Sequence, residues 1–217
     1  MPPILLLDLD GTLVDSVPDL LAALDRLLVP LGATPFTRAE VTAMVGDGVP
    51  ALVSRAFAAR AMREPPEAAA AFLADYTPRA AELTRPFPGI AAMLGALSDA
   101  GWRLAVCTNK PEAPARALLG SLGLAPHLAA IGGGDSFPVK KPDPRHLLAT
   151  LEAAGGRAEA AVMLGDHAND IHAARGAGIP AIFAGWGYGP PAMAADAPVA
   201  QTPEVVPALA GALLTAR

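Results

Sequence analysis

The chain has 217 residues, of which 53% are hydrophobic and 17% charged, and its formal net charge is −5. This balance predicts a folded globular protein with a sizeable core and excludes a disordered chain. A negative charge without a basic stretch argues against nucleic acid or an anionic membrane as partner. The single cysteine, Cys107, excludes an intrachain disulfide and fits a reducing compartment.

The first residues do not resemble a signal peptide. They lack a basic segment, and their apolar run, residues 4–7, ends at Asp8. No stretch reaches the ~20 apolar residues that a membrane span needs. We therefore expect a cytoplasmic protein.

Short apolar runs alternate with helix-like segments along most of the chain. The runs that we predict as strands are Ile4–Leu7, Arg103–Cys107, Leu128–Ile131, Ala161–Leu164 and Ala181–Phe183. Strands that alternate with helices are typical of a parallel α/β sheet.

Residues 16–85 interrupt this alternation, because they contain helical patterns and no convincing strand. The expected helices begin near Ser16 and Pro18, at the capping-box pair Thr37 and Glu40, at Pro50, and at Pro66, the last extending to Leu83. The returning segment 84–89 is rich in proline and glycine, as a hinge would be. We therefore expect an α/β domain of residues 1–15 and 86–217, with a helical domain of residues 16–85 inserted.

Two acids, Asp8 and Asp10, follow the first predicted strand and point to the same side of it. At ~4 Å and an effective dielectric constant of about 20, they would repel each other by roughly 4 kcal/mol. Because ligands of a parallel sheet bind beyond the carboxyl ends of its strands, residues after the other runs should meet these acids. Those residues are Thr108, Asn109 and Lys110, then Lys141, then Asp166 and Asp170. Each alone has an ordinary structural explanation, and only the ordered combination is specific.

The ordered combination resembles the four sequential motifs of the haloacid dehalogenase superfamily. The matching segments are Asp8-Leu9-Asp10-Gly11-Thr12, Thr108, Lys141-Pro142 and Gly165-Asp166-His167-Ala168-Asn169-Asp170. The resemblance implies a Rossmann-like parallel sheet with an inserted small α-helical cap domain. Three segments are similar to the phosphoglycolate phosphatase group in particular: Cys107-Thr108-Asn109-Lys110-Pro111, Lys141-Pro142-Asp143-Pro144 and Gly185-Trp186-Gly187-Tyr188-Gly189.

The resemblance implies catalytic and metal-binding roles for the first and fourth motifs. Asp8 would be the nucleophile that forms an aspartyl-phosphate. Asp10 would protonate the leaving alcohol and then deprotonate the attacking water. Asp8, the backbone carbonyl of Asp10 and Asp166 would hold Mg²⁺, which prefers oxygen ligands.

The other motif residues are expected to bind phosphate or to orient the site. Thr108 and the backbone of Asn109 would bind phosphoryl oxygens, and Lys141 would supply positive charge. Asp170 would orient metal-bound water or Lys141. His167 departs from the serine that is usual in this group's fourth motif, which leaves the local hydrogen bonding open.

The expected function is therefore a Mg²⁺-dependent phosphatase of a small phosphomonoester, with 2-phosphoglycolate as the preferred substrate. An arginine of the predicted cap domain could pair with the substrate carboxylate. The segment Gly46-Asp47-Gly48 is expected to contribute to specificity.

Several alternatives stay open or are disfavoured at this stage. Another small ester (a sugar phosphate, nucleotide or pyrophosphate) or a phosphomutase activity is open. A 2-haloacid dehalogenase would leave Asp10 unexplained, and a catalytically dead binding protein would not need every motif residue. A non-enzymatic phospho-receiver domain would not carry its phosphoacceptor on the first strand or contain a long helical insert.

Some residues outside the motifs are expected to be structural. Asp15 and Ser16 would begin the first helix of the insert. Trp186 and Tyr188 would pack over the last strand, and Cys107 would be a small buried strand residue.

Overall fold

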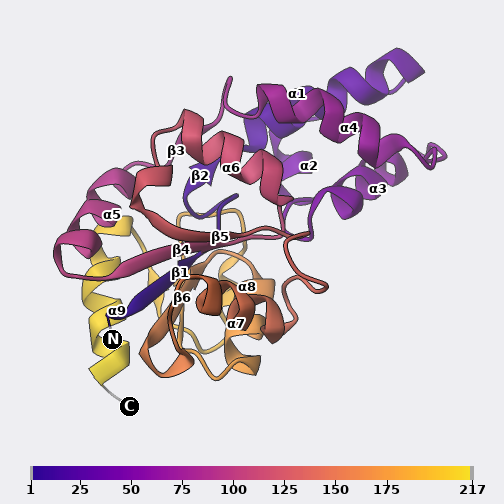
Figure 1. Cartoon of the computed structure of the whole chain (residues 1–217). Helices are drawn as coiled ribbons and strands as arrows, with labels where there is room; N and C mark the ends of the chain where they lie inside the picture. Colours follow the sequence, from indigo (N-terminus) through magenta and orange to yellow (C-terminus); the bar gives the residue numbers. More distant parts are fainter. Residues whose placement is uncertain (1, 216–217) are drawn as a thin grey trace.

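A computed structural model describes residues 2–215 of the chain. Within them, six parallel strands form one sheet in the order β5-β4-β1-β6-β7-β8 (Figure 1). The strands are β1 (Ile4–Leu7), β4 (Arg103–Cys107), β5 (Leu128–Gly132), β6 (Ala161–Gly165), β7 (Ala181–Ala184) and β8 (Val199–Ala200). All the predicted strands are confirmed. Strand β8 was not predicted, because two residues carry no pattern.

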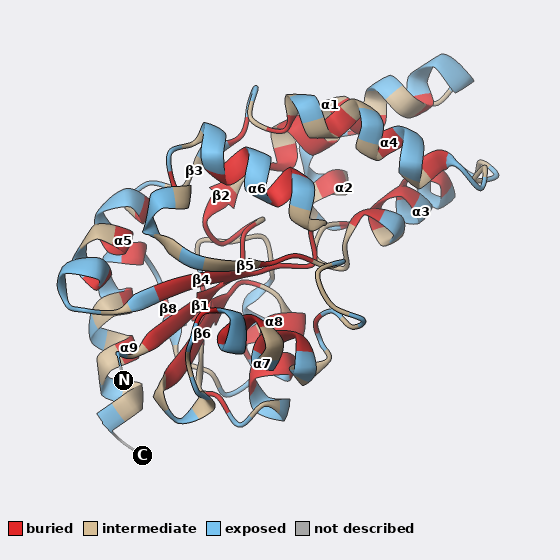
Figure 2. Cartoon of the chain, viewed as in Figure 1, coloured by how far each residue is buried: buried red, intermediate tan, exposed pale blue. Residues whose placement is uncertain are grey.

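Helices cover both faces of the sheet (Figure 1). One face packs against α5 (Ile90–Asp99), α6 (Glu112–Ser121) and α9 (Val206–Thr215), and the other against α7 (Pro144–Ala153) and α8 (Ala168–Gly176). Side chains alternate between the faces along a strand, so Leu5 and Leu7 belong to the first core and Ile4 and Leu6 to the second. The central strands are buried on both sides, as Figure 2 shows.

The helical insert (residues 16–85) has an apolar core of its own. It contains α1 (Val17–Leu28), α2 (Arg38–Thr42), α3 (Val49–Ala59) and α4 (Ala68–Tyr76), and it extends away from the sheet in Figure 1. Its buried residues include Leu24, Val53, Phe57 and Phe72. These findings confirm a Rossmann-like fold with an α-helical insertion. The domain boundaries themselves stay a prediction.

A short antiparallel pair of strands, β2 (Val14–Asp15) and β3 (Arg85–Pro86), connects the insert to the sheet. The carboxylate of Asp19, in the first turn of α1, accepts hydrogen bonds from the backbone N–H groups of Leu83 and Thr84 at 2.7–3.0 Å. The entering and returning chains are therefore held together at the base of the insert.

Helix ends agree with the sequence patterns in one case and differ in two. The capping box at Thr37 and Glu40 is confirmed by reciprocal hydrogen bonds. Ser16 occupies the position before α1, but its hydroxyl makes no capping bond. The fourth helix is shorter than predicted and ends at Tyr76, because the 3₁₀ turn Thr77–Arg79, with Pro78 inside it, follows at once.

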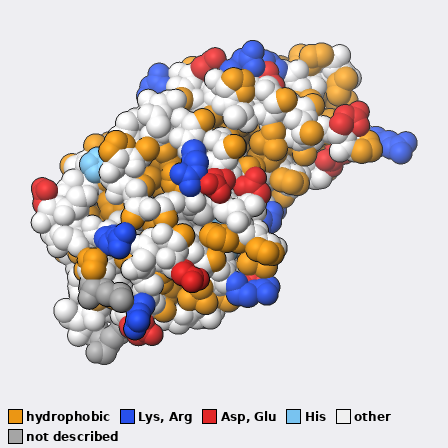
Figure 3. All heavy atoms as spheres, in the orientation of Figure 1, with side chains coloured by type: hydrophobic (Ala, Val, Ile, Leu, Met, Phe, Trp, Pro, Cys, Tyr) orange, Lys and Arg blue, Asp and Glu red, His pale blue; other side chains and the backbone are white. Residues whose placement is uncertain are grey.

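The surface charge is mixed on the face that Figure 3 shows. There the described Lys and Arg side chains are dispersed among acidic and apolar ones. No helix among residues 2–215 is long and apolar enough to cross a membrane.

Candidate active site

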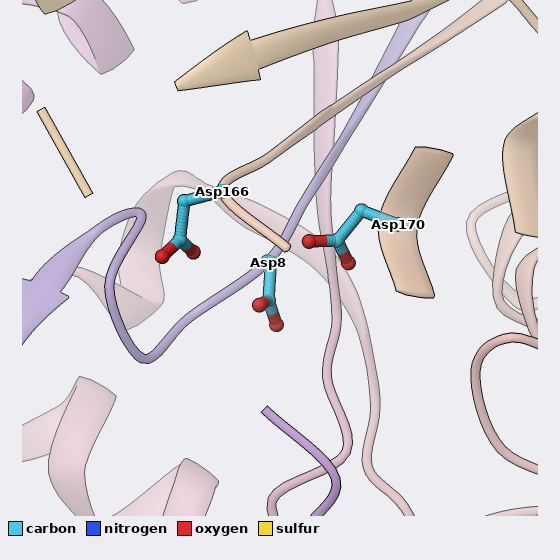
Figure 4. A group of neighbouring side chains, drawn as sticks. All are labelled: Asp8, Asp166 and Asp170. Carbon is cyan, nitrogen blue, oxygen red and sulfur yellow. The ribbon is translucent and has the colours of Figure 1, made fainter. Parts of the chain in front are cut away.

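Three buried carboxylates meet at the carboxyl end of the sheet. Asp8 follows β1, Asp166 follows β6 and Asp170 lies in the first turn of α8 (Figure 4). One oxygen of each lies within 4.8 Å of the others. Since β1 and β6 are paired parallel neighbours, their following residues necessarily lie side by side.

Lys141 supplies positive charge to this cluster. Its Nζ atom lies 2.8 Å from Asp8 Oδ1 and 2.6 Å from Asp170 Oδ1, and its side chain is buried. Burial alone would lower the pKa of Lys141, but the Asp170 and Asp8 carboxylates raise it above its ordinary value. Lys141 is therefore a permanent cation, and it offsets part of the repulsion between the acids.

Asp166 is held by hydrogen bonds to both of its oxygens. The hydroxyl of Thr12 donates to Oδ1 at 2.8 Å, and the backbone N–H of Tyr188 donates to Oδ2 at 2.7 Å. Burial, together with the Asp8 and Asp170 carboxylates, raises the pKa of Asp166 to about 7. With all three acids ionised the cluster carries more negative charge than Lys141 balances, and its donors are all oxygens. That combination suits a hard divalent cation.

Glycines let the backbone close around Asp166. A Cβ atom on Gly187 would lie 2.5 Å from the Gly11 carbonyl oxygen and would overlap the Asp166 side chain. A Cβ atom on Gly189 would overlap the Asp166 carbonyl oxygen. The Gly-rich segment 185–189 is therefore part of the site, for a steric reason.

The carboxylate of Asp10 stands apart from the acid cluster and pairs with Lys110. The Nζ atom of Lys110 donates to Asp10 Oδ1 at 3.0 Å and Oδ2 at 3.2 Å, and to the Tyr76 hydroxyl at 2.7 Å. Sequence reasoning gave Lys110 no role, although its position two residues after Thr108 was a usable signal. Nothing in the sequence pattern pointed to Tyr76, which is the last residue of α4.

Thr108 and Asn109 lie buried beyond β4, as expected from their place in the sequence. The Asn109 side chain donates from Nδ2 to the carbonyl oxygens of Gly46 and Lys141, both at 3.0 Å. This amide therefore ties the insert to the sheet, a contact that the sequence did not indicate.

The segment Gly46-Asp47-Gly48 lies against the site, where a specificity loop was expected. Asn169 Nδ2 donates to Asp47 Oδ1 at 2.7 Å, and Lys140 Nζ donates to the Asp47 carbonyl oxygen at 2.6 Å. His167 caps α8, with Nδ1 accepting from the Asn169 N–H at 3.2 Å. A Cβ atom on Gly46 would lie 2.7 Å from the His167 ring, so the His167 ring packs directly against Gly46.

Tyr188 connects the sheet to the start of the insert. Its hydroxyl accepts from the N–H groups of Ser16 and Val17 at 2.8 and 3.2 Å and donates to Asp15 Oδ1 at 2.9 Å. Tyr188 thus satisfies the first turn of α1, which explains why the Ser16 hydroxyl is not needed there. The expectation that Tyr188 only packs over the last strand was incomplete.

Two cavities adjoin Asp8 and Asp10. One, of about 40 Å³, is also lined by Thr108, Asn109, Lys110 and apolar side chains of the insert. The other, of about 260 Å³, is lined by residues that include Asp166, His167 and Tyr188.

No arginine of the insert, within the described residues, lines either cavity. That an arginine of the insert pairs with the substrate carboxylate therefore stays a prediction, without support from the cavity lining. Five of the arginines of the insert pair with carboxylates instead. The ion pairs are Arg26 and Arg79 with Asp75, Arg38 with Asp15, Arg55 with Asp47, and Arg60 with Glu40.

A parallel sheet with three acids and a lysine gathered beyond the carboxyl ends of its strands is a Rossmann-like fold with a site suited to phosphate chemistry. Residues 5–184 match the family model described as haloacid dehalogenase-like hydrolase. The chain belongs to this family.

Relatives of known name indicate the group within this family to which the chain is most similar. The chain is 45% identical over 193 residues to a phosphoglycolate phosphatase of Agrobacterium fabrum, covering 87% of this chain and 82% of the relative. It is 44% identical over 196 residues to one of Rhodospirillum rubrum, with 87% and 81% covered. These relatives confirm the predicted phosphoglycolate phosphatase group and the class of phosphoric monoester hydrolase.

A solved structure agrees with the fold. The crystal structure of a predicted phosphoglycolate phosphatase from Haemophilus somnus is similar at a TM-score of 0.87 and 26% identity, with 96% of this chain and 97% of that chain covered. The similarity therefore includes the insert as well as the sheet.

Proposed function

We propose that the chain is a Mg²⁺-dependent phosphatase that hydrolyses 2-phosphoglycolate to glycolate through an aspartyl-phosphate, in the cytoplasm. The observation that carries the proposal is the buried group of Asp8, Asp166 and Asp170 around Lys141. The substrate follows from the relatives named above.

In this proposal Asp8 attacks phosphorus. As the bond between Asp8 and phosphorus forms, the ester bond to the leaving alcohol breaks and Asp10 gives its proton to the alcohol oxygen. Asp10 then takes a proton from water, whose oxygen attacks phosphorus and releases Asp8 and inorganic phosphate. Atoms and charges balance, since Asp10 returns to its protonated form.

The donors fit Mg²⁺, and Asp8, Asp166 and the Asp10 carbonyl oxygen would hold it. When bound, the ion would offset the negative charge of the acids and of the phosphoryl oxygens. Asp170, whose carboxylate lies 2.6 Å from Lys141 Nζ, positions that lysine.

Phosphate binding would fall to Thr108, the Asn109 backbone and Lys141. Thr108 and Asn109 line the smaller cavity together with Asp8, and Lys141 Nζ lies 2.8 Å from Asp8 Oδ1. The helical insert acts as a cap domain over the site. It excludes bulk water, so that the aspartyl-phosphate is hydrolysed only by the water that Asp10 deprotonates. Its contact through Gly46 and Asp47 with Asn109 and the sheet supports that role.

A panel of phosphomonoesters with Mg²⁺ tests the proposal. We expect phosphate release with 2-phosphoglycolate preferred over sugar phosphates, nucleotides and pyrophosphate. Asp8→Asn should abolish turnover, and Asp10→Asn should slow both formation and hydrolysis of the aspartyl-phosphate. Absence of turnover on every ester would refute the phosphatase, and preference for another ester would refute the substrate.

A further inference from the structure

Lys110 is a buried cation at the edge of the candidate active site. Its side chain is 2% exposed, and its ammonium contacts both Asp10 oxygens and the Tyr76 hydroxyl. Burial lowers the pKa of Lys110, but Asp10 and Tyr76 raise it more, so the net pKa lies above its ordinary value. Lys110 is therefore charged at neutral pH, and a buried charge needs a partner.

Lys110 is also well placed to meet a substrate. Among the described residues that line the two cavities, it is the one lysine or arginine. The smaller cavity, which holds Lys110, is walled by the apolar side chains Leu20, Val45, Val49 and Leu52 of the insert. At about 40 Å³ it has room for only a few heavy atoms, and its polar end is formed by Lys110 with the catalytic acids.

The ammonium of Lys110 can bind a second anion beside Asp10. It has three N–H donors, and its partners are the two oxygens of the Asp10 carboxylate and the Tyr76 hydroxyl. A carboxylate on the leaving alcohol is an anion that takes no part in the attack at phosphorus, and an ammonium that lines the cavity beside Asp8 is positioned to pair with it.

We propose that Lys110 binds a carboxylate of the leaving alcohol and so makes the enzyme selective for short phosphorylated hydroxy acids. This inference deepens the proposed phosphatase function and rests on it. It also moves substrate selection from the arginines of the insert to a lysine of the sheet domain.

Tyr76 fixes Lys110 from the side of the insert. Its hydroxyl accepts from Lys110 Nζ at 2.7 Å, and the ammonium lies 4.6 Å from the ring centroid. The ring stacks on Phe72 and is fully buried, and burial raises the pKa of Tyr76 to about 12. Tyr76 is therefore a neutral positioning residue. Because it is the last residue of α4, it can contact Lys110 only when α4 is docked over that lysine.

The test compares two probes of equal chain length, 2-phosphoglycolate and 2-hydroxyethyl phosphate, which differ in the carboxylate. Binding of each is measured by calorimetry at fixed Mg²⁺, in an Asp8→Asn background that prevents turnover. Lys110→Met should weaken binding of 2-phosphoglycolate by about 10- to 100-fold, the value of a hydrogen bond to a charged group, and leave 2-hydroxyethyl phosphate within about threefold. Lys110→Arg should keep the preference for the carboxylate, and Tyr76→Phe should reduce it by about two- to tenfold.

Arg26→Met is the matched control, because Arg26 pairs with Asp75 on the surface of the insert. It should leave the preference between the probes as in the parent protein. An unchanged preference in Lys110→Met overturns the proposal, as does an equal loss for both probes, which would make Lys110 purely structural. If Lys110→Met does not fold, an unchanged preference in Tyr76→Phe overturns it.

Failure of the proposed function is distinguishable from failure of this inference. Turnover of the unmodified protein on the ester panel decides the first. The binding preference between the two probes needs no turnover and decides the second.

Discussion

Removal of the Lys141 charge should destabilise the protein strongly. Lys141→Met keeps the length of the side chain but leaves Asp8 and Asp170 without their shared cation. The side chains of Lys141, Asp8 and Asp170 are only 2%, 10% and 1% exposed, so water cannot replace the ammonium. After the change, Asp170 keeps the hydrogen bond that its Oδ2 atom accepts from the His167 N–H at 3.0 Å.

The size of the effect follows from this burial. Removal of one partner of a buried ion pair typically costs about 3–5 kcal/mol, and we expect Lys141→Met to fall in that range. Adding Asp170→Asn removes one of the stranded charges. The double variant should therefore be more stable than the sum of the two single effects predicts, by about 1–3 kcal/mol.

Urea unfolding at neutral pH with a metal chelator present measures these free energies. The control is Arg145→Met, because Arg145 pairs with Asp143 at the surface, with its side chain 71% exposed. That pair should be worth less than about 1 kcal/mol. Additive effects of Lys141→Met and Asp170→Asn, or a cost for Lys141→Met no larger than for the control, would refute the reasoning.

Three further outcomes are expected. Burial, with Lys141 nearby, lowers the pKa of His146 to about 4 from 6.5, so the unfolded chain binds the proton more readily and stability falls as pH drops from 6.5 toward 4. His146→Gln keeps a donor for the Gly133 carbonyl oxygen, and urea titrations across this window should show a shallower acid loss; an unchanged slope would contradict the assignment. Gly187→Ala should displace Asp166 and weaken Mg²⁺ binding in calorimetry, whereas native affinity would show that the backbone can yield. Thr37→Ala should cost about 1 kcal/mol in thermal unfolding through loss of the capping box, without changing turnover.

Much of the sheet could be predicted from the sequence because its signals are local. Continuous apolar runs such as residues 4–7 mark strands buried on both faces, and acids or lysines directly after them mark the strand ends. Since parallel strands present their carboxyl ends at one edge, Asp8, Thr108, Lys141 and Asp166 could be brought together without coordinates. The capping box at Thr37 was equally local.

Other parts of the site depend on contacts that no local pattern encodes. Lys110 and Tyr76 are 34 positions apart, and Ser16 and Tyr188 are 172 apart. Each side chain alone is consistent with an ordinary core or surface position. Their roles arise only when α4 docks over the sheet edge and the segment 185–189 closes over the start of α1.

The sequence by itself therefore determined that two acids lie at the end of the first strand. Only the tertiary structure decided which lysine pairs with each acid. Asp8 and Asp10 lie two residues apart on one strand end, but the first pairs with Lys141 and the second with Lys110. The physical reason is that a buried charge is stabilised by whichever opposite charge lies within a few ångströms. Packing of the strand ends and of the insert sets that distance, and it is not a property of the neighbouring sequence.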